Sequence, residues 1–394
     1  MLKPIKFIPH NACTGCESCC AVCGVNSIEM VRDKRGFRYP MIDTDKCTGC
    51  GSCERVCPVL NPVEQDKSIR PAQRFFAARA ANREVISSSS SGGIFSVIAN
   101  FMLENNGAVC GAAFDDKFTV VHQVAENTED LNPLCSSKYV QSSTHKALKV
   151  LRKLTAKSGG ILFVGTPCQV AGARKLLGNR NPASVFVEVV CHGVPSPGVF
   201  NRYIHELEAA QGSPLQSLNF RDKSHGWKSY RFKATFDNGS EISEDGHRNA
   251  YVDGFIDNLY LRKSCTECRF KNFKSGADIT IGDFWGVDAL HNPMYSDDEG
   301  VSLLCVNTPR GQEVFESIKP HLKDITEITF DQAAHKNECL IDSTQANFRT
   351  ARFYRFLKKH SVAESVKMSK RVTFLDKVRI SLKYRLSLLK NEKS

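Results

Sequence analysis

Residues 12–58 read ACTGCESCCAVCGVNSIEMVRDKRGFRYPMIDTDKCTGCGSCERVCP and hold nine of the seventeen cysteines in the chain. Eight of the nine form two runs with identical spacing, and we interpret the ninth, Cys20, as a bystander. Regular short spacing of this kind indicates metal or redox chemistry in a reducing compartment rather than disulfide bonds. The first run is Cys13, Cys16, Cys19 and Cys23, and the second is Cys47, Cys50, Cys53 and Cys57.

The doubled C-x2-C-x2-C-x3-C spacing is typical of bacterial ferredoxins that hold two [4Fe–4S] clusters. A tight loop can place three thiolates around one cluster, but the chain must leave before it can supply a fourth. The fourth cysteine of each run is therefore expected to reach the other cluster. This predicts one cluster on Cys13, Cys16, Cys19 and Cys57, and a second cluster on Cys47, Cys50, Cys53 and Cys23.

The alternative interpretation of these runs is a pair of structural zinc sites, because CxxC pairs also bind zinc. Zinc gains nothing from the third cysteine of each run, so the iron–sulfur interpretation is favoured. Between the runs, residues 27–31 and 38–42 read as short strands of a small fold. Such a unit is too small to build a sufficient core alone, so we expect cluster loss to unfold it.

The chain has 394 residues, of which 41% are hydrophobic and 24% are charged, an ordinary composition that excludes disordered and coiled-coil proteins. No stretch reaches the roughly 18 uninterrupted apolar residues of a membrane helix. The N-terminus has no apolar signal core, so we expect a cytoplasmic protein. Residues 366–394 contribute +7 of the net charge of +11. Because the basic excess is not spread over the folded body, nucleic-acid binding is disfavoured.

The larger part of the chain follows a polar, proline-punctuated segment at 61–74, which we interpret as a linker. Residues 161–165 and 185–190 are short apolar strands, and each precedes a cysteine-containing loop and a helical pattern. This alternation predicts a parallel sheet with crossover helices. Cys168 and Cys191 stand just beyond the carboxyl ends of these strands, where open α/β sheets bind ligands.

A later CxxC pair, Cys265 and Cys268, supplies two thiolates and needs two more for a closed site. Cys168 and Cys191 would complete a set of four. From the residues alone two alternatives stay open: isolated cysteines are often buried small hydrophobic residues, and a CxxC can be a dithiol redox pair. Four further cysteines lack such a context, and we interpret them as structural: Cys110, Cys135, Cys305 and Cys339.

Five consecutive serines at 87–91 precede Gly92 and Gly93 and an apolar helical pattern that begins at Ile94. One interpretation is a flexible loop. The other is a turn that presents backbone N–H groups and the positive end of a helix to a phosphate.

Several motifs, in order along the chain, resemble the family of coenzyme F420 hydrogenase and dehydrogenase beta subunits, in its form with a fused N-terminal two-cluster ferredoxin. The resemblance spans residues 13 to about 308. The motifs are SSSGGIF at 89–95, SSKYVQSS at 136–143, GTPCQVAG at 165–172, CHGVPSP at 191–197, FRDKSHGWKSY at 220–230, CTECRF at 265–270 and ADITIGDFWG at 277–286.

With the patterns above, this resemblance implies an α+β protein in which a small bacterial-type dicluster ferredoxin domain precedes a larger α/β flavin and iron–sulfur domain. The expected boundaries are 1–60 for the first domain, 61–74 for the linker, 75–345 for the second domain and 346–394 for a basic helical tail. The resemblance also implies a third [4Fe–4S] cluster on Cys168, Cys191, Cys265 and Cys268. It further implies an FAD site that includes Gly92, Gly93, Lys138, Tyr139, Thr166 and Gln169.

The implied activity is an oxidoreductase. Clusters pass single electrons, F420 or another organic substrate exchanges a hydride, and a flavin can do both. Candidates near the substrate are His192, Lys223, His225 and Trp227, and none is named as a catalytic acid. The expected partners are a small organic hydride substrate and an electron donor or acceptor protein such as ferredoxin or a dehydrogenase complex. Alternative functions are a non-catalytic electron-transfer subunit of a larger redox complex and a ferredoxin-dependent reductase associated with cell-surface polysaccharide synthesis.

The C-terminal tail carries apolar residues at helical spacing with basic residues between them. Either this helix packs on the body with a solvated basic face, or it lies on an anionic membrane surface or a partner. The apolar positions are Leu375, Val378, Leu382, Leu386 and Leu389.

Overall fold

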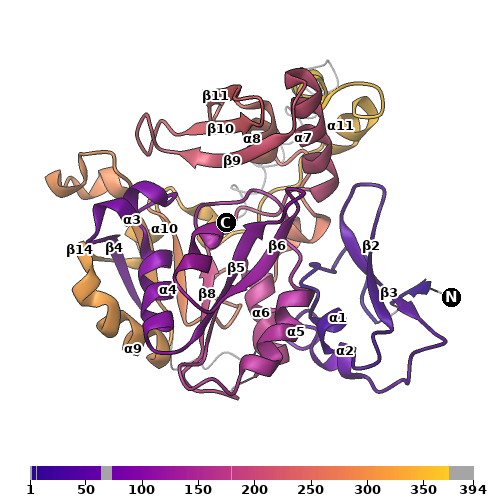
Figure 1. The fold of residues 1–394 in the computed structure, drawn as a ribbon, viewed down its shortest axis with the longest axis horizontal. Helices are drawn as coiled ribbons and strands as arrows, with labels where there is room; N and C mark the ends of the chain where they lie inside the picture. Colours follow the sequence, from indigo (N-terminus) through magenta and orange to yellow (C-terminus); the bar gives the residue numbers. More distant parts are fainter. Residues whose placement is uncertain (1, 6, 64–72, 179, 372–394) are drawn as a thin grey trace, which may run out of the picture.

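The computed structural model describes residues 2–5, 7–63, 73–178 and 180–371 (Figure 1). Residues 64–72 of the expected linker and the basic helix expected at 375–389 lie outside the described residues. Below, residues 2–63 are called the N-terminal unit and residues 73–371 the body. None of the described helices combines the length and the apolar character that a membrane span requires.

The N-terminal unit contains one small antiparallel sheet in the order β1-β3-β2 and two short helices. The strands expected at 27–31 and 38–42 are confirmed, and Met30 pairs with Pro40 across them. Gly15 and Gly49 occupy the same place in the two cysteine runs, and both have a φ of 69°, which favours glycine. The elements are β1 (Leu2–Pro4), α1 (Ser18–Val22), β2 (Ile28–Arg32), β3 (Arg38–Asp43) and α2 (Ser52–Arg55).

The body is built on an eight-stranded sheet in the order β14-β4-β13-β12-β8-β7-β5-β6. The four central strands β12, β8, β7 and β5 are parallel, whereas the outer strands pair antiparallel. The expected parallel sheet is therefore confirmed only for the centre. The strands are β4 (Arg74–Ala80), β5 (Ala108–Phe114), β6 (Val120–Ala125), β7 (Ile161–Gly165), β8 (Val185–Val189), β12 (Ile279–Asp283), β13 (Ser302–Val306) and β14 (Leu322–Ile328).

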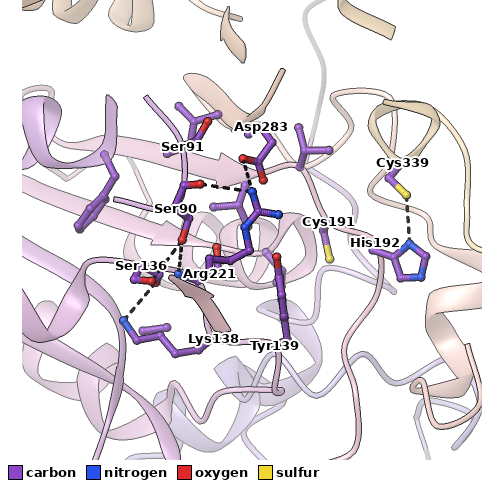
Figure 2. A pocket seen from close by; sticks show the side chains of 18 of the residues that line it. Ser90, Ser91, Ser136, Lys138, Tyr139, Cys191, His192, Arg221, Asp283 and Cys339 are labelled. Carbon is purple, nitrogen blue, oxygen red and sulfur yellow. Dashed lines mark hydrogen bonds and ion pairs between the residues drawn. The ribbon is translucent and has the colours of Figure 1, made fainter. Parts of the chain in front are cut away.

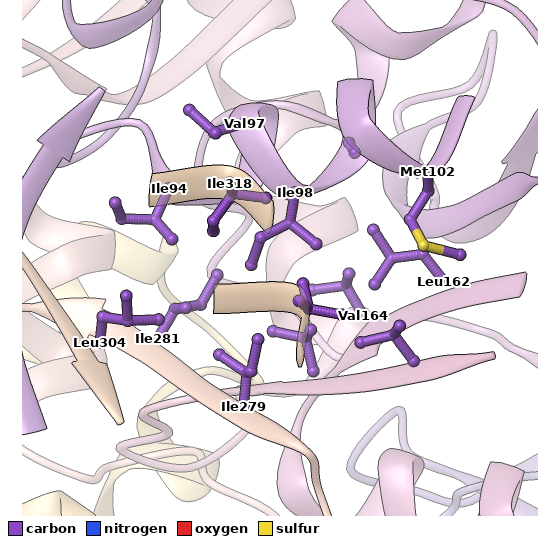
Figure 3. Packing of buried hydrophobic residues seen from close by; sticks show 14 of the residues in the cluster. Ile94, Val97, Ile98, Met102, Leu162, Val164, Ile279, Ile281, Leu304 and Ile318 are labelled. Atoms are coloured by element: carbon purple, nitrogen blue, oxygen red, sulfur yellow. The ribbon is translucent and has the colours of Figure 1, made fainter. Parts of the chain in front are cut away.

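Helices cover both faces of this sheet, and the alternation of side chains along each strand explains why the strands are apolar throughout. On β7, Leu162 and Val164 pack toward α4 and α9 (Figure 3), whereas Ile161 and Phe163 pack toward α5 and α6. Burying each such large apolar side chain contributes about 1.5–3 kcal/mol. These layers include α3 (Arg83–Ser88), α4 (Ile94–Glu104), α5 (His145–Leu154), α6 (Pro167–Leu177), α9 (Pro309–Ile318) and α10 (Phe330–Ala334).

A second, antiparallel sheet in the order β11-β10-β9 lies above the large sheet (Figure 1). Its core is rich in aromatic residues, and the described part of the expected tail packs into it through Phe353, Val362 and Val366. The elements are α7 (Pro197–Gln211), β9 (Leu215–Asp222), β10 (Arg231–Phe236), β11 (Glu241–Asp245), α8 (Ala250–Ile256), α11 (Thr350–Phe356) and α12 (Val362–Lys370). Short 3-10 segments are Glu129–Leu134, Lys263–Glu267, Val287–Leu290, Pro293–Tyr295, Lys319–His321 and Glu338–Leu340.

Candidate functional site

The first set of expected cluster ligands lines one small cavity of about 20 Å³ in the N-terminal unit. Burial, together with the neighbouring thiols of Cys57 and Cys13, raises the pKa of Cys16 to about 11. The fourth cysteine of the second run thus lies beside the first run, as crossed ligation requires. We call these residues the inner thiol group: Cys13, Cys16, Cys19 and Cys57.

The remaining cysteines of the two runs lie nearer the surface, and we call Cys23, Cys47, Cys50 and Cys53 the outer thiol group. Cys47 and Cys50 are exposed. Cys23 and Cys53 are partly buried and pack against the same apolar cluster as the inner thiol group. The backbone N–H of Ser27 donates to Cys23 Sγ at 3.2 Å. The outer group therefore places two thiols where a partner protein can approach.

Four thiols of the body converge from three separate segments. Cys168 begins α6, Cys191 follows β8, and Cys265 and Cys268 belong to or directly follow the 3-10 segment Lys263–Glu267. Burial, then repulsion from the other thiols, raises the pKa of Cys191 and of Cys265 to about 12, and raises that of Cys168 further. Each of the four raises the pKa of at least one other. We call this set the body thiol group.

This donor set fits an iron–sulfur cluster. Buried thiols that repel one another as thiolates need a strongly cationic centre among them, and a coordinating metal deprotonates a thiol outright. Among the described residues, no three His, Cys, Asp or Glu side chains are arranged to hold a single metal ion. A cuboidal cluster does not require that arrangement, because each thiolate binds a different iron.

The inner and body thiol groups are neighbours across the contact between the N-terminal unit and the body. Gly172 lies one helical turn after Cys168 on α6, and a Cβ atom at Gly172 would stand 3.0 Å from Cys16 Sγ and 2.5 Å from Ser18 Oγ. The thiol of Cys16 also contributes to the raised pKa of Cys168. The order outward from the body is therefore body group, inner group, outer group.

A cavity of about 560 Å³ opens beyond the carboxyl ends of β7, β8 and β12 (Figure 2). Cys191 of the body thiol group lines it. Its position at the carboxyl ends of parallel strands and its size are typical of small-molecule sites in α/β proteins. Five of the six residues expected to contact a flavin line this cavity: Gly93, Lys138, Tyr139, Thr166 and Gln169.

Gly92, the sixth, stands behind the cavity wall. Its N–H donates to Ser302 Oγ at 3.0 Å, and a Cβ atom would come within 2.7 Å of the Ala78 carbonyl oxygen. The turn that starts α4 therefore packs directly on the sheet. Gly93, with a φ of 87°, and Ile94 place the positive end of this helix at the cavity.

Three of the expected flavin residues are held by their own hydrogen bonds. Lys138 Nζ donates to the carbonyl oxygens of Pro133, Cys135 and Ser136, and burial lowers the pKa of Lys138 to about 8. Gln169 Nε2 donates to Ser142 Oγ at 2.8 Å, and Gln169 Oε1 accepts from the Thr166 N–H at 3.0 Å. These hydrogen bonds hold the three side chains in place at the cavity wall, and those of the Lys138 ammonium all go to backbone carbonyl oxygens.

Of the four candidates expected near the substrate, the structure places one at the cavity. His192 lines the cavity, where its Nε2 lies 2.6 Å from Asn258 Oδ1 and its Nδ1 lies 3.4 Å from Cys339 Sγ. Lys223, His225 and Trp227 do not line the cavity. The Lys223 ammonium donates to three backbone carbonyls, and His225 is exposed beside Ser224.

Two further expectations need correction or refinement. Trp227 is buried and donates from Nε1 to Asp283 Oδ1 at 2.7 Å, so it supports a residue of the cavity wall from behind. Cys339, which we interpreted as structural, lines the cavity beside His192 (Figure 2). The segment that carries Cys339 lies far from any recognisable motif, so no sequence pattern indicated its place at the cavity.

Arg221 lines the cavity and belongs to the FRDKSHGWKSY motif, although it was not among the four substrate-side candidates. It is 2% exposed, and its Nη2 donates to Asp283 Oδ1 at 3.2 Å, whereas its Nε has no hydrogen-bond partner among the described residues. The guanidinium lies over the rings of Tyr230 and Trp285, at 4.0 and 4.9 Å from their centroids. A buried cation with an unsatisfied donor at a cavity wall is suited to an anionic or acceptor group of a ligand.

Glu188 on β8 provides a pH-dependent test of this part of the sheet. It is 3% exposed, and burial outweighs the hydrogen bonds from Ser275 and Thr280 and raises its pKa from 4.5 to about 7. The folded chain therefore keeps a proton that the unfolded chain releases, so stability falls as pH rises from about 4.5 to about 7, by ~3 kcal/mol in all. Glu188→Gln is expected to remove this dependence, measured by anaerobic chemical denaturation at pH 4.5 and pH 8. An unchanged pH dependence in the variant would contradict the assignment.

Family models identify the family to which this chain belongs. The two models described as coenzyme F420 hydrogenase/dehydrogenase, beta subunit, match residues 75–149 with the N-terminal model and 159–328 with the C-terminal model. The chain belongs to this family. Two 4Fe-4S dicluster models match residues 12–61 and 39–91. The expectation of a ferredoxin-like [4Fe–4S] domain followed by a larger mixed α/β domain is thereby confirmed.

No curated protein matches the sequence significantly. Among solved structures, the chain is similar to one in the F420-reducing [NiFe] hydrogenase complex from Methanosarcina barkeri, with 17% identity and a TM-score of 0.46. That match covers 68% of this chain and 89% of the other. The family models therefore show that this chain is an iron–sulfur electron-transfer protein related to the beta subunits of F420 hydrogenases and dehydrogenases.

Proposed function

We propose that this family member is an iron–sulfur flavoprotein oxidoreductase that passes electrons between [4Fe–4S] clusters and, through FAD, coenzyme F420 or another organic hydride donor or acceptor. The observation that carries the proposal is the convergence of the four body thiols beside the large cavity, whose wall includes Cys191. An electron carrier and a site for an organic cofactor thus adjoin one another.

Each of the three thiol groups would hold one [4Fe–4S] cluster, which supplies single-electron exchange when bound. The chain's own contribution is placement and burial. The outer group lies at the surface, the inner group is enclosed, and the body group adjoins the cavity. An electron donor or acceptor protein would meet the outer group, where Cys47 and Cys50 are exposed.

The residues of the large cavity fit FAD. When bound, a flavin exchanges both single electrons and hydride, which joins cluster chemistry to an organic substrate. Arg221 and the start of α4 offer positive charge to its phosphates or ring oxygens, and Tyr139, Tyr230 and Trp285 offer aromatic surface. Among the described residues, three side chains of this wall have a buried nitrogen without a hydrogen-bond partner: Arg221 Nε, His122 Nδ1 and Asn337 Nδ2.

His192 is oriented at the same cavity by Asn258 and Cys339. Burial lowers the pKa of His192, so the imidazole is neutral at physiological pH. Because Nε2 donates to Asn258 Oδ1, the nitrogen that can accept a hydrogen bond is Nδ1, which lies beside Cys339 Sγ. The place of His192 near the body thiol group is consistent with a role in positioning substrate.

We propose the same division of the chain as the sequence indicates: a ferredoxin-type domain at 1–60, a linker at 61–74, a flavin and iron–sulfur domain at 75–345 and a C-terminal tail at 346–394.

The decisive experiment is metal and flavin analysis of protein purified without oxygen. We expect about twelve irons per chain, four for each cluster, together with about one FAD. A screen of reduced F420, NADH, NADPH and reduced ferredoxin then identifies the donor by flavin bleaching. About twelve irons without flavin would favour the alternative, a non-catalytic electron-transfer subunit, and protein that binds zinc instead of iron would contradict both.

Arg221→Gln tests the flavin site directly. Loss of a buried charged donor costs about 1.5–3 kcal/mol, so the affinity for FAD is expected to fall by ~10–100-fold. The measurement is fluorescence titration of FAD into protein stripped of flavin. The matched control is Arg79→Gln, because Arg79 is 1% exposed and paired with Asp297 but does not line the cavity. Equal affinities in the two variants would remove Arg221 from the site.

A further inference from the structure

Arg262 is a fully buried cation at the contact between the body and the N-terminal unit, with an exposed fraction of 0%. Its Nε donates to the carbonyl oxygen of Cys13 at 2.8 Å, and its Nη2 lies 3.6 Å from Cys13 Sγ. Both Nη atoms donate to the Arg38 carbonyl oxygen at 3.1 Å. One side chain of the body therefore contacts both the carbonyl oxygen and the sulfur of Cys13, the first cysteine of the inner thiol group.

The same residue is fixed to the body thiol group through the backbone. Arg262 stands three residues before Cys265, and its carbonyl oxygen accepts a hydrogen bond from the Cys265 N–H at 3.0 Å. Its N–H donates to the carbonyl oxygen of Val194, in the loop that follows Cys191. Arg262 thus contacts the inner group through its side chain and the segments of the body group through its backbone.

The surroundings hold the guanidinium in one place. It lies over the Tyr39 ring at 4.1 Å from the centroid, and its Nη1 donates to Gln141 Oε1 at 3.0 Å. Gln141 in turn donates to the carbonyl oxygen of Thr14 at 2.9 Å. A Cβ atom at Gly15 would stand 2.8 Å from Arg262 Nη1, so the cysteine loop closes directly on the charge.

No carboxylate pairs with this buried charge: within the described ranges, Arg262 forms no ion pair. Every hydrogen-bond acceptor it reaches is a carbonyl oxygen, an amide oxygen or the Cys13 sulfur. A buried cation without a counter-ion costs several kcal/mol. Four thiolates around a cluster beside it would supply the missing negative charge.

We propose that Arg262 is a positioning residue that provides the counter-charge of the inner cluster and raises the reduction potential of that cluster. This inference rests on the proposed function. Reduction adds a negative charge to a cluster, and a buried cation with an N–H···S hydrogen bond stabilises the reduced state more than the oxidised one. Arg262 thereby favours electron residence at the inner cluster, next to the body thiol group.

The test is a redox titration of the full chain, purified anaerobically and followed by electron paramagnetic resonance, for wild type, Arg262→Gln and Arg262→Lys. In Arg262→Gln, one of the three cluster potentials is expected to fall by at least the equivalent of a tenfold change in equilibrium constant, which is 59 mV for one electron. The affected signal is the one that Cys57→Ser abolishes. Arg262→Lys keeps the charge but not the planar fork, so a smaller fall is expected.

Arg79→Gln is again the control, because it removes a buried arginine that contacts no thiol group, and it should leave all three potentials unchanged. Wild-type protein without iron would overturn the proposed function itself. Wild-type protein with its clusters, but unchanged potentials in Arg262→Gln, would overturn only the role of Arg262, as would an equal shift of all three. If Arg262→Gln does not assemble its clusters, an unchanged potential of the inner cluster in Arg262→Lys would likewise overturn the role of Arg262.

Discussion

Replacing Cys268 with serine is expected to remove about four of the roughly twelve irons per chain and to slow electron exchange between the cavity and the N-terminal unit by at least ~100-fold. Cys268 is one of four thiols that face one another between Cys16 and the cavity. A hydroxyl is a poor ligand for iron compared with a thiolate, and the other ligands come from distant segments. Loss of one ligand therefore leaves the body group without a cluster while the N-terminal unit keeps about eight irons.

The measurement combines iron analysis with the rate at which a flavin-reducing donor reduces the clusters of the N-terminal unit. Cys135→Ser is the matched control, since Cys135 is a partly buried thiol of the body that donates to the Leu131 carbonyl oxygen, a bond that serine can keep. The control should retain all iron and the wild-type rate. Full iron content in Cys268→Ser would show that the body thiol group is not a cluster site.

The local parts of this architecture could be predicted from the sequence because their determinants are local. The repeated cysteine spacing fixes two metal-binding loops, and the apolar runs at 161–165 and 185–190 fix buried strands. Chain reach alone predicted that Cys57 would lie with the first run, and the structure places it in one cavity with that run. The start of α4 after Gly93 could also be predicted, because a serine- and glycine-rich turn precedes an apolar helical pattern.

Features that depend on distant segments could not be predicted in this way. The antiparallel edge formed by β13, β4 and β14 pairs residues separated by more than 200 positions, such as Phe76 with Leu304. The burial of Arg221, which stands in the FRDKSHGWKSY motif, and of Arg262 could not be predicted, because it is set by Asp283, Cys13 and other partners far along the chain. Lys223 and His225 stand in the same motif as Arg221, yet neither of them lines the cavity.

Glu17, which lies between Cys16 and Cys19 in the first cysteine run, links the N-terminal unit to the body. Its carboxylate is 1% exposed and forms an ion pair with Arg38 at 3.0 Å. From the body it accepts hydrogen bonds from Ser143 Oγ at 2.7 Å, from the Thr144 N–H at 2.8 Å and from His145 Nδ1 at 2.9 Å. A single acidic side chain thus joins the cysteine loop to the start of α5.

Glu17→Gln is expected to destabilise the protein by about 3–5 kcal/mol, because it leaves the partly buried Arg38 charge without its counter-ion and forces a fully buried amide among groups that all donate. The loss should appear in anaerobic denaturation and as faster hydrogen exchange in β2 and β3. Glu29→Gln is the control, since Glu29 is exposed on β2 of the same unit. If both variants unfold at the same denaturant concentration, Glu17 does not hold the two parts together. A Glu17→Gln protein that keeps its irons but exchanges electrons slowly with the cavity would show that this contact, rather than cluster assembly, sets the transfer rate.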